Sequence, residues 1–284
     1  MAHGTPSSVD EMPEHLRLVR SGRPASDTLI AEMRHNYEAI GGRSPLTDIT
    51  LAQAEALERR LQPDVAVAAG MRNWKPFITE AMGALADAGV EHVIGIPLAP
   101  QFSTLSVKKY IDAARAALPG GMRFEGVESF HLHPLLIEAF AERLRAAQPR
   151  PDERVVFTAH SLPVSAIESG DRYAEEVAAT ARAVADRAGI TRYERAYQSA
   201  GRTAEPWLGP DLATLIAELS GAGLRKFLIA PIGFVCDHTE ILFDIDIQAA
   251  GVARELRATL RRTESLNTST TFISALEDIV RQML

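Results

Sequence analysis

Short apolar runs rich in β-branched residues alternate along the chain with longer segments in which apolar residues recur every three or four positions. The short runs predict strands, and the longer segments predict amphipathic helices. Strands are expected over residues 64–70, 91–97, 122–130, 153–159, 191–198 and 225–232. Helices are expected over residues 51–62, 76–88, 105–118, 134–148, 171–188, 210–221 and 268–283.

This alternation is typical of α/β proteins with largely parallel sheets. The near-continuous apolar runs VVF and FLIA indicate strands that are buried on both faces. A length of 284 residues corresponds to about two domains. The proline-containing linker 144–154 is the best candidate for the boundary, so we expect one domain over 1–148 and a second over 149–265.

The charge balance and the absence of certain motifs narrow the function. Lys and Arg number 30 against 37 Asp and Glu, so the formal net charge is −7. Because non-specific nucleic-acid binding depends mostly on neutralising phosphates, an acidic chain argues against it. No predicted strand is followed by a glycine-rich dinucleotide motif or a P-loop, so no nucleotide site is expected. No stretch of about 18 apolar residues exists, so no membrane span is expected.

The single cysteine, Cys236, excludes a disulfide framework within one chain. It also excludes any zinc or iron–sulfur site that takes four thiolates from one chain. One cysteine fits a reducing, cytoplasmic setting, and we expect it to be a small buried apolar residue.

Polar side chains stand where several predicted strands end, which is where ligands bind in open parallel sheets. His160 follows the run VVFTA, and an imidazole at that place can act as a base or a metal ligand near neutral pH. A buried, hydrogen-bonded structural histidine is the alternative. Ser161 lacks the glycines of a nucleophile elbow, so it is not favoured as a nucleophile. Polar residues also follow predicted strands at positions 70–73 and 198–201.

The segment 236–247 is rich in acids. If it is helical, Asp237, Glu240 and Asp244 lie on one face, and such a line of carboxylates can bind a hard divalent cation. The alternative is a capping box that Asp237 and Glu240 make at a helix start. The capping box leaves His238 and Asp244 without an explanation.

Arg17, Arg20 and Arg23 recur every three residues, with no acid between positions 15 and 26. On a helix they form one cationic stripe that suits carboxylates through forked hydrogen bonds. A solvated surface face is the alternative. Ser44 follows a Gly-Gly turn, where it can donate to an anion or cap the next helix.

Eight sequence blocks stand in order along nearly the whole chain: MAHGTP, YEAIGGRSPL, GMRNWKPFI, PLAPQFSTLSVKKY, FTAHSLP with GDRY, YQSAGRTAEPWLGPD, PIGFVCDHTEILFDID and LNTSTTFISAL. Together they resemble the ferrochelatases, and most closely the soluble bacterial coproporphyrin type. Ordered blocks in this number are far more specific than any single short motif.

The resemblance implies a fold of two Rossmann-like, chelatase-type α/β domains with parallel sheets and a porphyrin in the cleft between them. The helix within 266–284 is expected to pack back on the first domain. The implied reaction is insertion of Fe²⁺ into a porphyrin, with loss of two pyrrole protons, in haem biosynthesis. Coproporphyrin III is the favoured substrate, and protoporphyrin IX is the alternative.

The resemblance also implies roles for individual residues. His160 is similar to the invariant histidine of the family, and Glu240 to its glutamate partner across the porphyrin; these two are the expected catalytic pair. His160, Glu240 and Asp244 are the expected metal contacts. Asp237 and His238 are expected to support them. The residues expected to line the porphyrin or its propionates are His3, Arg20, Tyr37, Ser44 and Tyr110.

No cofactor beyond the substrate Fe²⁺ is implied, which means no iron–sulfur cluster and no nucleotide. The expected partners are the porphyrin, Fe²⁺ and the haem product, without nucleic acid and with at most peripheral membrane contact. A cytoplasmic monomer is expected.

Three features depart from the family's pattern. His3 replaces a tyrosine that often contacts the iron of the product, although imidazole is also an able iron ligand. Gln248 stands where an acid often extends the line of carboxylates. Family members carry an apolar first strand just before the first block. We therefore expect this strand to be shortened here or to begin upstream of Met1, and a missing sheet edge to cost stability.

Two other functions stay open. One is a chelatase of the same superfold that loads cobalt or nickel into a reduced tetrapyrrole, and the GDRY and WLGPD segments argue against it. The other is a non-catalytic haem- or porphyrin-binding protein, and the presence of both His160 and Glu240 argues against it.

Overall fold

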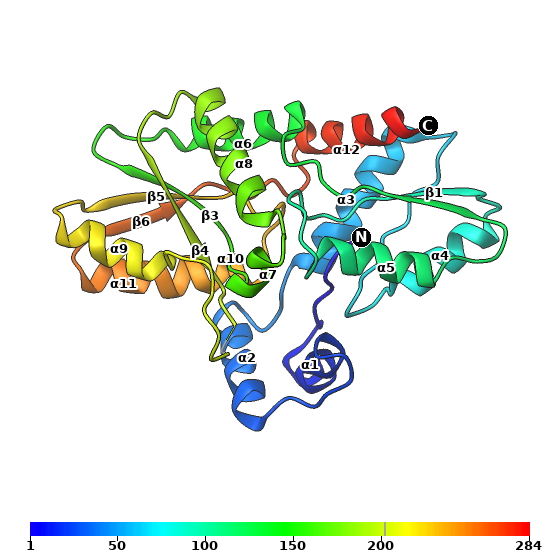
Figure 1. Ribbon diagram of the computed structural model, residues 1–284, viewed down its shortest axis with the longest axis horizontal. Helices are drawn as coiled ribbons and strands as arrows, with labels where there is room; N and C mark the ends of the chain where they lie inside the picture. Colours follow the sequence, from blue (N-terminus) through cyan, green and yellow to red (C-terminus); the bar gives the residue numbers. More distant parts are fainter. Residues whose placement is uncertain (202) are drawn as a thin grey trace.

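The computed structural model describes residues 1–201 and 203–284. Two parallel sheets lie toward opposite ends of the long axis of the molecule (Figure 1). The smaller sheet pairs β1 (His92–Gly95) with β2 (Arg123–Gly126). The larger sheet has the order β4-β3-β5-β6, with β3 at Arg154–His160, β4 at Tyr193–Gln198, β5 at Lys226–Pro231 and β6 at Thr259–Arg262.

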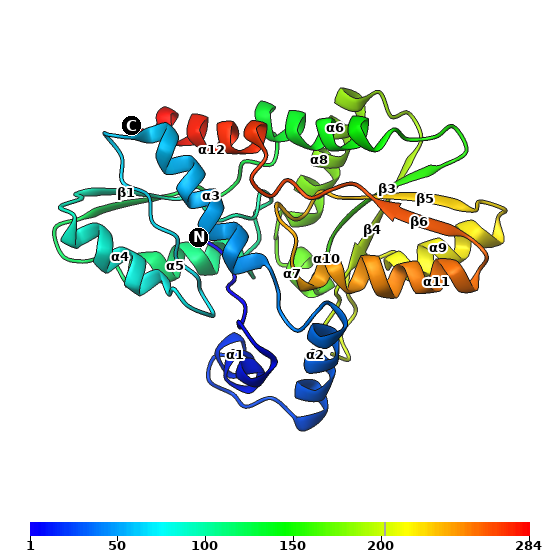
Figure 2. The same cartoon turned by 180° about the vertical axis from the view of Figure 1, so that it is seen from behind.

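Helices pack around both sheets (Figure 1 and, from behind, Figure 2). Where the sequence predicts helices, the structure has α3 (Leu46–Leu61), α4 (Ile78–Asp87), α5 (Val107–Ala116), α6 (Pro134–Ala147), α8 (Tyr173–Ala188), α9 (Leu212–Gly221) and α12 (Thr270–Met283). It adds α1 (Met12–Val19), α2 (Asp27–Ala39), α7 (Val164–Glu168), α10 (Thr239–Leu242) and α11 (Ala250–Glu255). A 3₁₀ turn, η1, spans Val9–Glu11, and a π-helix, η2, spans Asp244–Ala249.

The central strands β3 and β5 are buried on both faces. Val156 belongs to a different core cluster from its neighbours Val155 and Phe157, because successive side chains of a strand point to opposite faces. On β5, the neighbours Leu228 and Ile229 likewise belong to different core clusters. Helices α6, α8 and α12 cover one face, and α9 and α11 cover the other. The α/β class with parallel sheets is therefore confirmed, as is burial of these strands on both faces.

One core cluster reaches from the larger sheet to the helices beside the smaller one. It joins Phe157 of β3 and Leu276 of α12 to Leu57 of α3. Helix α12 contacts both α3 and α6, and α6 contacts α8. The C-terminal helix thus ties the two ends of the molecule together, while the division of the chain at 148 and 149 stays a prediction.

Two strand predictions differ from the structure. Residues 64–70 form no strand, and the next residue, Met71, makes only isolated bridges. Strand β6 is not predicted, because its sequence TLRR has no apolar run. Its polar residues suit the edge of the sheet, where Arg261 pairs with Glu153 at 2.6 Å.

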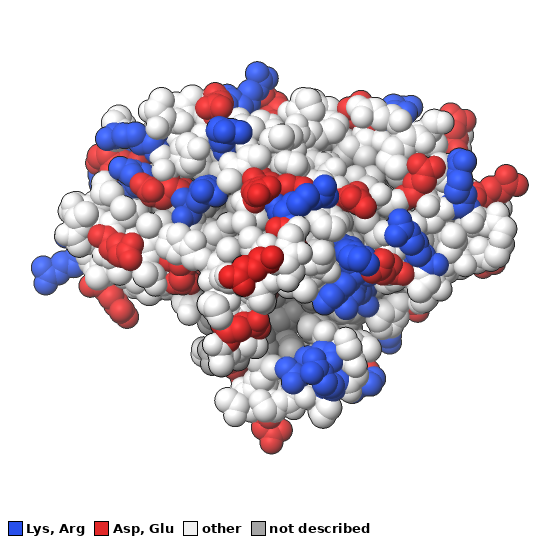
Figure 3. Space-filling view, in the orientation of Figure 1, with Lys and Arg blue, Asp and Glu red and all other residues white. Residues whose placement is uncertain are grey.

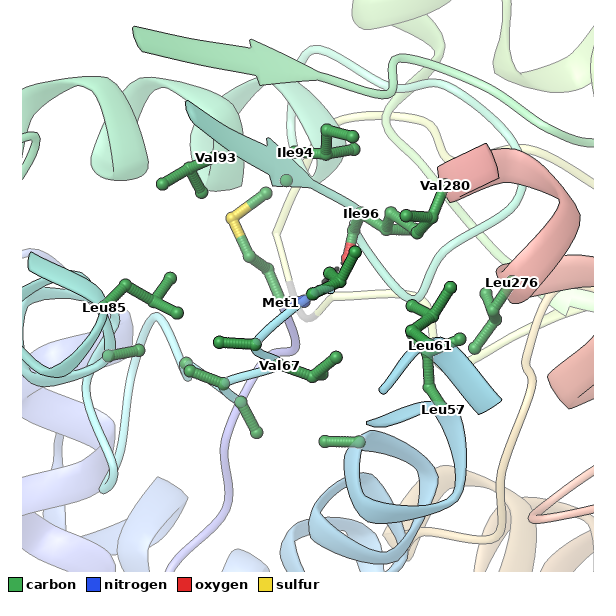
Figure 4. Close-up of a pocket in the computed structure, with 18 of the residues that line it drawn as sticks. Met1, Leu57, Leu61, Val67, Leu85, Val93, Ile94, Ile96, Leu276 and Val280 are labelled. Carbon is green, nitrogen blue, oxygen red and sulfur yellow. Dashed lines mark hydrogen bonds between the residues drawn. The ribbon is translucent and has the colours of Figure 1, made fainter. Parts of the chain in front are cut away.

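An apolar cavity lies beside residues 64–70, and β1 does not pair with them. It has a volume of about 160 Å³ and lies between this segment and β1. Met1 and Ala2 border it: the Met1 amino group donates to the Ile96 carbonyl at 2.6 Å, and the Ala2 N–H donates to the Gly70 carbonyl at 3.1 Å. Burial lowers the pKa of this amino group to about 5. The cavity lining includes Leu57, Val67, Ile94, Leu276 and Val280 (Figure 4).

The surface carries charges of both signs. Figure 3 shows acidic and basic side chains interspersed over one face, and the surface is hollowed between the α1–α2 part and the two sheets. No helix among the described residues is both long enough and apolar enough to cross a membrane.

Two leucines of α3 allow a matched test of the core. Leu57 is 7% exposed within the largest cluster, whereas Leu51 is 45% exposed on the same helix. Leu57→Ala should lower the free energy of unfolding by about 2–4 kcal/mol, because it removes buried methyl groups and leaves a cavity. Leu51→Ala should change it by less than about 1 kcal/mol. Urea unfolding measures both, and equal losses would contradict this packing.

Candidate active site

His160 is the last residue of β3, and Pro163 follows as the N-cap of α7. The Nδ1 of the His160 ring donates a hydrogen bond to the Ser161 carbonyl oxygen. This bond assigns the proton of the neutral ring to Nδ1 and leaves the lone pair on Nε2. The Ser161 hydroxyl donates to the Leu208 carbonyl at 2.8 Å, so it holds the backbone in place. Nε2 of His160 is therefore the atom that can accept a proton here.

Glu240 faces His160. Its Oε1 lies 3.5 Å from Nε2 of His160, and its Oε2 lies 3.4 Å from Nε2 of His238. The Glu240 carbonyl accepts a hydrogen bond of 2.7 Å from the side-chain amide of Gln198, which pairs with His160 at the ends of β4 and β3. The His160 and Glu240 side chains are 32% and 39% exposed, so a substrate can reach them.

Asp244 lies at the start of the π-helix η2, just after α10. The Gln248 N–H donates at 2.9 Å to the Phe243 carbonyl, five residues earlier, which is the wide turn of a π-helix. The Asp244 carboxylate accepts a hydrogen bond from the Ser199 hydroxyl. Its charge also acts on His160. Asp244 therefore lies close to the pair, as the acidic spacing predicts.

The expectation that Asp237 shares a helix face with Glu240 is wrong. Helix α10 begins after His238, so Asp237 lies outside it. The Asp237 carboxylate accepts hydrogen bonds from the Ser265 hydroxyl at 2.7 Å and the Asn267 amide at 2.9 Å. It also pairs with Arg262 at 3.0 Å. The capping-box alternative is wrong as well, because the N-cap residue is His238 and no side chain caps α10.

The charges of His160 and Glu240 stabilise each other, whereas Glu240 disfavours the charge of Asp244. Burial alone lowers the pKa of His160, but the charge of Glu240, the hydrogen bond to it and the Ser161 carbonyl raise it to about 9. Burial raises the pKa of Glu240, yet His160 and His238 together hold it well below its usual range. The pair is therefore ionised at neutral pH, with a proton on His160. Burial and the charge of Glu240 raise the pKa of Asp244 to about 6.

His3 reaches the same region from the N-terminal segment. The Asn73 side-chain amide lies 3.2 Å from Nδ1 of His3, and the His15 ring lies edge-on to it with 5.9 Å between centroids. Burial and His15 lower the pKa of His3 to about 4, although Glu240 acts in the opposite direction. His3 is therefore neutral at physiological pH, and one ring nitrogen carries a lone pair.

The structure buries three residues that are expected to line the porphyrin, namely Tyr37, Ser44 and Tyr110. Burial raises the pKa of Tyr37, and the side chains of Thr239, Thr5 and Ser44 act in the opposite direction. Tyr110 lies on α5, where burial raises its pKa to about 12. Their hydroxyls therefore stay protonated at neutral pH. Contact of Tyr37, Ser44 and Tyr110 with a porphyrin stays a prediction.

The expected cationic stripe is wrong as a helical face. Helix α1 ends at Val19, so Arg20 is its C-cap residue and Arg23 lies beyond it. Arg17 makes two hydrogen bonds to Glu14, of 2.7 and 2.8 Å. In contrast, Nε of Arg20 is buried and makes no hydrogen bond within the part of the chain that the structure describes. Among these three arginines, only Arg20 has a buried guanidinium donor without a partner in the described residues.

Three residues near the site are not singled out by their sequence. Arg72 lowers the pKa of His3, and Asn73 contacts the His3 ring. Ser199 donates to Asp244. All three belong to short polar segments that directly follow predicted strands. Their place at a strand end is the sequence feature that could have identified them as site residues.

The converging groups define the chemistry that the site can perform. An imidazole nitrogen and two carboxylates lie together where a substrate can reach them, which suits proton transfer and contact with a divalent cation. Over residues 1–201 and 203–284, no three His, Cys, Asp or Glu side chains form a ready-made metal cluster. Metal contact by His160, Glu240 and Asp244 stays a prediction.

The His160–Glu240 pair can be tested without substrate. Glu240→Gln removes the charge that raises the pKa of His160, so burial should then dominate. We expect the NMR titration midpoint of the His160 ring to fall from about 9 to below the ordinary value of about 6.5. Glu264→Gln, at an acid whose side chain is 83% exposed, is the control and should leave the midpoint unchanged. A midpoint that stays near 9 in Glu240→Gln would contradict the assignment.

Comparisons with solved structures support the fold. SirB of Bacillus subtilis with Fe³⁺ superposes with a TM-score of 0.58 at 13% identity, over 83% of this chain and 88% of that one. CbiX, described as the terminal enzyme for biosynthesis of siroheme in denitrifying bacteria, gives 0.57 at 14% identity, over 84% and 93%. Identities this low show the fold alone, and they confirm the chelatase-type fold.

Sequence comparisons identify the family. A sequence model described as Ferrochelatase matches residues 1–284. The ferrochelatase of Deinococcus radiodurans is 43% identical over 99% of this chain and 94% of that protein. The coproporphyrin III ferrochelatase of Geobacillus kaustophilus is 39% identical over 99% of this chain and 93% of that protein. With matches that extend over essentially its whole length, the chain belongs to the ferrochelatase family.

Proposed function

We propose that this ferrochelatase inserts Fe²⁺ into coproporphyrin III with His160 as the base and Glu240 as its partner. The reaction replaces two pyrrole protons of the porphyrin by one Fe²⁺, so the site needs groups that accept protons beside the macrocycle. The observation that carries the assignment is the accessible pair of His160 Nε2 and Glu240 Oε1, 3.5 Å apart.

The pKa order indicates how the protons move. His160 begins protonated, because its pKa is about 9, and it must release that proton before it can accept another. A divalent cation that approaches Glu240 and Asp244 offsets their negative charge and lowers the pKa of His160. Nε2 is then free to take the first pyrrole proton. Asp244, with a pKa of about 6, is a better acceptor for the second than Glu240, whose pKa lies well below its usual range.

One observation supports recognition of propionates in general, and a second favours coproporphyrin III over protoporphyrin IX. Coproporphyrin III carries four propionates and protoporphyrin IX carries two. A buried guanidinium donor without a partner is costly, and a carboxylate satisfies it through a charge-assisted hydrogen bond. Nε of Arg20 is such a donor. The relative from Geobacillus kaustophilus is named a coproporphyrin III ferrochelatase. Protoporphyrin IX stays the alternative.

The remaining expectations also stand as proposals. The thiol of Cys236 is buried and its pKa is raised to about 12, so it offers no thiolate for an iron–sulfur cluster. We therefore propose that the protein uses no metal besides the substrate iron. We also propose a cytoplasmic monomer.

The base is tested by His160→Ala. We expect insertion of Fe²⁺, followed by absorbance under anaerobic reducing conditions, to fall at least 100-fold while the porphyrin still binds. His133→Ala is the matched control, because His133 forms a pair of the same kind with Asp278 at 3.0 Å. It should retain wild-type turnover. Near-wild-type turnover of His160→Ala would refute the role of His160 as base.

The substrate is tested by Arg20→Ala. We expect the KM for coproporphyrin III to rise about 10- to 100-fold, which corresponds to the loss of one hydrogen bond to a charged group. The KM for protoporphyrin IX should rise less, because that substrate has fewer propionates. Arg17→Ala is the control, since Arg17 already pairs with Glu14. Equal losses for both porphyrins would count against recognition of the additional propionates by Arg20.

A further inference from the structure

Asn267 lies in the turn before α12, outside the catalytic pair. Its backbone is left-handed, with φ of 46°, a conformation that asparagine tolerates better than most residues. Its N–H donates to the Val235 carbonyl at 2.9 Å. Its carbonyl accepts a hydrogen bond of 2.7 Å from the side chain of Gln53, which is 1% exposed on α3. The backbone of Asn267 is thus fixed on both sides.

The side chain of Asn267 forms a reciprocal pair with Asp237. Oδ1 of Asn267 accepts the Asp237 backbone N–H at 2.9 Å, and Nδ2 of Asn267 donates to Oδ2 of Asp237 at 2.9 Å. The other carboxylate oxygen of Asp237 accepts from Ser265 at 2.7 Å and pairs with Arg262 at 3.0 Å. The carboxylate of Asp237 is therefore engaged by the protein itself.

This pair anchors the segment that carries Glu240. Helix α10 has four residues, and no side chain caps its start, so it holds its own position weakly. His238 follows Asp237 directly. Its Nδ1 donates a hydrogen bond of 3.0 Å to the Cys236 carbonyl, and its Nε2 lies 3.4 Å from Oε2 of Glu240. The Asn267–Asp237 bonds tie both the backbone and the side chain of Asp237, at the start of this segment, to the turn before α12.

We propose that Asn267 is a positioning residue of the iron site, whose amide clamps Asp237 and so sets the place of Glu240 opposite His160. The proposal rests on the function proposed above. Asn267 contacts neither member of the catalytic pair, so its effect passes through Asp237. Partners of this kind, which orient the groups that contact a metal, are typically worth 10- to 100-fold in metal affinity or activity.

Exchanging the two polar groups tests the clamp. Asn267→Asp keeps the size of the side chain but places two carboxylates against each other. Asp237→Asn removes the charged acceptor. In the double variant N267D/D237N the amide donates from position 237 and the carboxylate accepts at position 267, so both bonds can form again. We expect each single variant to lower kcat/KM for Fe²⁺ at least 10-fold, and the double variant to return within about threefold of wild type.

The variant Asn267→Gly distinguishes the contribution of the side-chain amide from that of the left-handed backbone. Glycine keeps the left-handed conformation without strain but lacks the amide. We expect the same loss in kcat/KM for Fe²⁺ as in Asn267→Asp, with the binding of porphyrin unchanged. Wild-type activity in Asn267→Gly, or no recovery in the double variant, would overturn the clamp.

The NMR titration of His160 gives a readout that a merely structural role would not move. In folded single variants we expect the midpoint to fall below the wild-type value of about 9, and in N267D/D237N to return to it. An unchanged midpoint in every single variant would overturn the proposal. This measurement needs no turnover, so it still decides the role of Asn267 if wild type inserts no iron and the proposed function fails.

Discussion

The site depends on one electrostatic interaction, the pairing of a protonated His160 with an ionised Glu240 at 3.5 Å. Burial opposes the charged form of each group, and the charge of each favours the ionised form of the other. The pair is nevertheless open to the surface, because both side chains are about one-third exposed. A cation that takes part of the charge of Glu240 therefore changes the proton affinity of His160 directly. Metal entry and proton release become linked by this one contact.

The fold holds the two partners from different directions. His160 ends a strand that is buried between two helical layers, so its position is set by the core of the larger sheet. Glu240 belongs to a short helix that has little stability of its own, and it is held by Gln198 on one side and by the Asp237–Asn267 bonds on the other. The following π-helix then brings Asp244 to the same region. A rigid base thus faces an acid whose place depends on tertiary hydrogen bonds.

Much of this arrangement can be predicted from the sequence, because the signals are local. The apolar run of β3 delivers His160 to a strand end, and the acid spacing brings Glu240 and Asp244 together. The position of Asp237 cannot be predicted locally, since its partner Asn267 is 30 residues away. The expected cationic stripe on α1 overlooked Gly22, whose φ of 88° suits the chain just past a helix end.

The two strand predictions that differ from the structure also have a physical cause. Residues 64–70 have strand-like composition, but a strand needs a neighbour, and a cavity lies between them and β1. Strand β6 has a polar composition, but it forms a strand because it pairs with its neighbour β5. Composition describes how a segment can be buried, whereas pairing depends on what the rest of the chain places beside it.

The pH dependence of kcat/KM for the porphyrin, measured at a fixed low concentration of Fe²⁺ under anaerobic conditions, tests the central claim most directly. This parameter reports the ionisation of the free enzyme. If His160 is the base and Glu240 raises its pKa to about 9, kcat/KM should rise about tenfold per pH unit between pH 7 and the pKa, and then level off. The same profile in Glu240→Gln should level off at a lower pH. A profile that is flat between pH 7 and 9 in wild type would contradict the account.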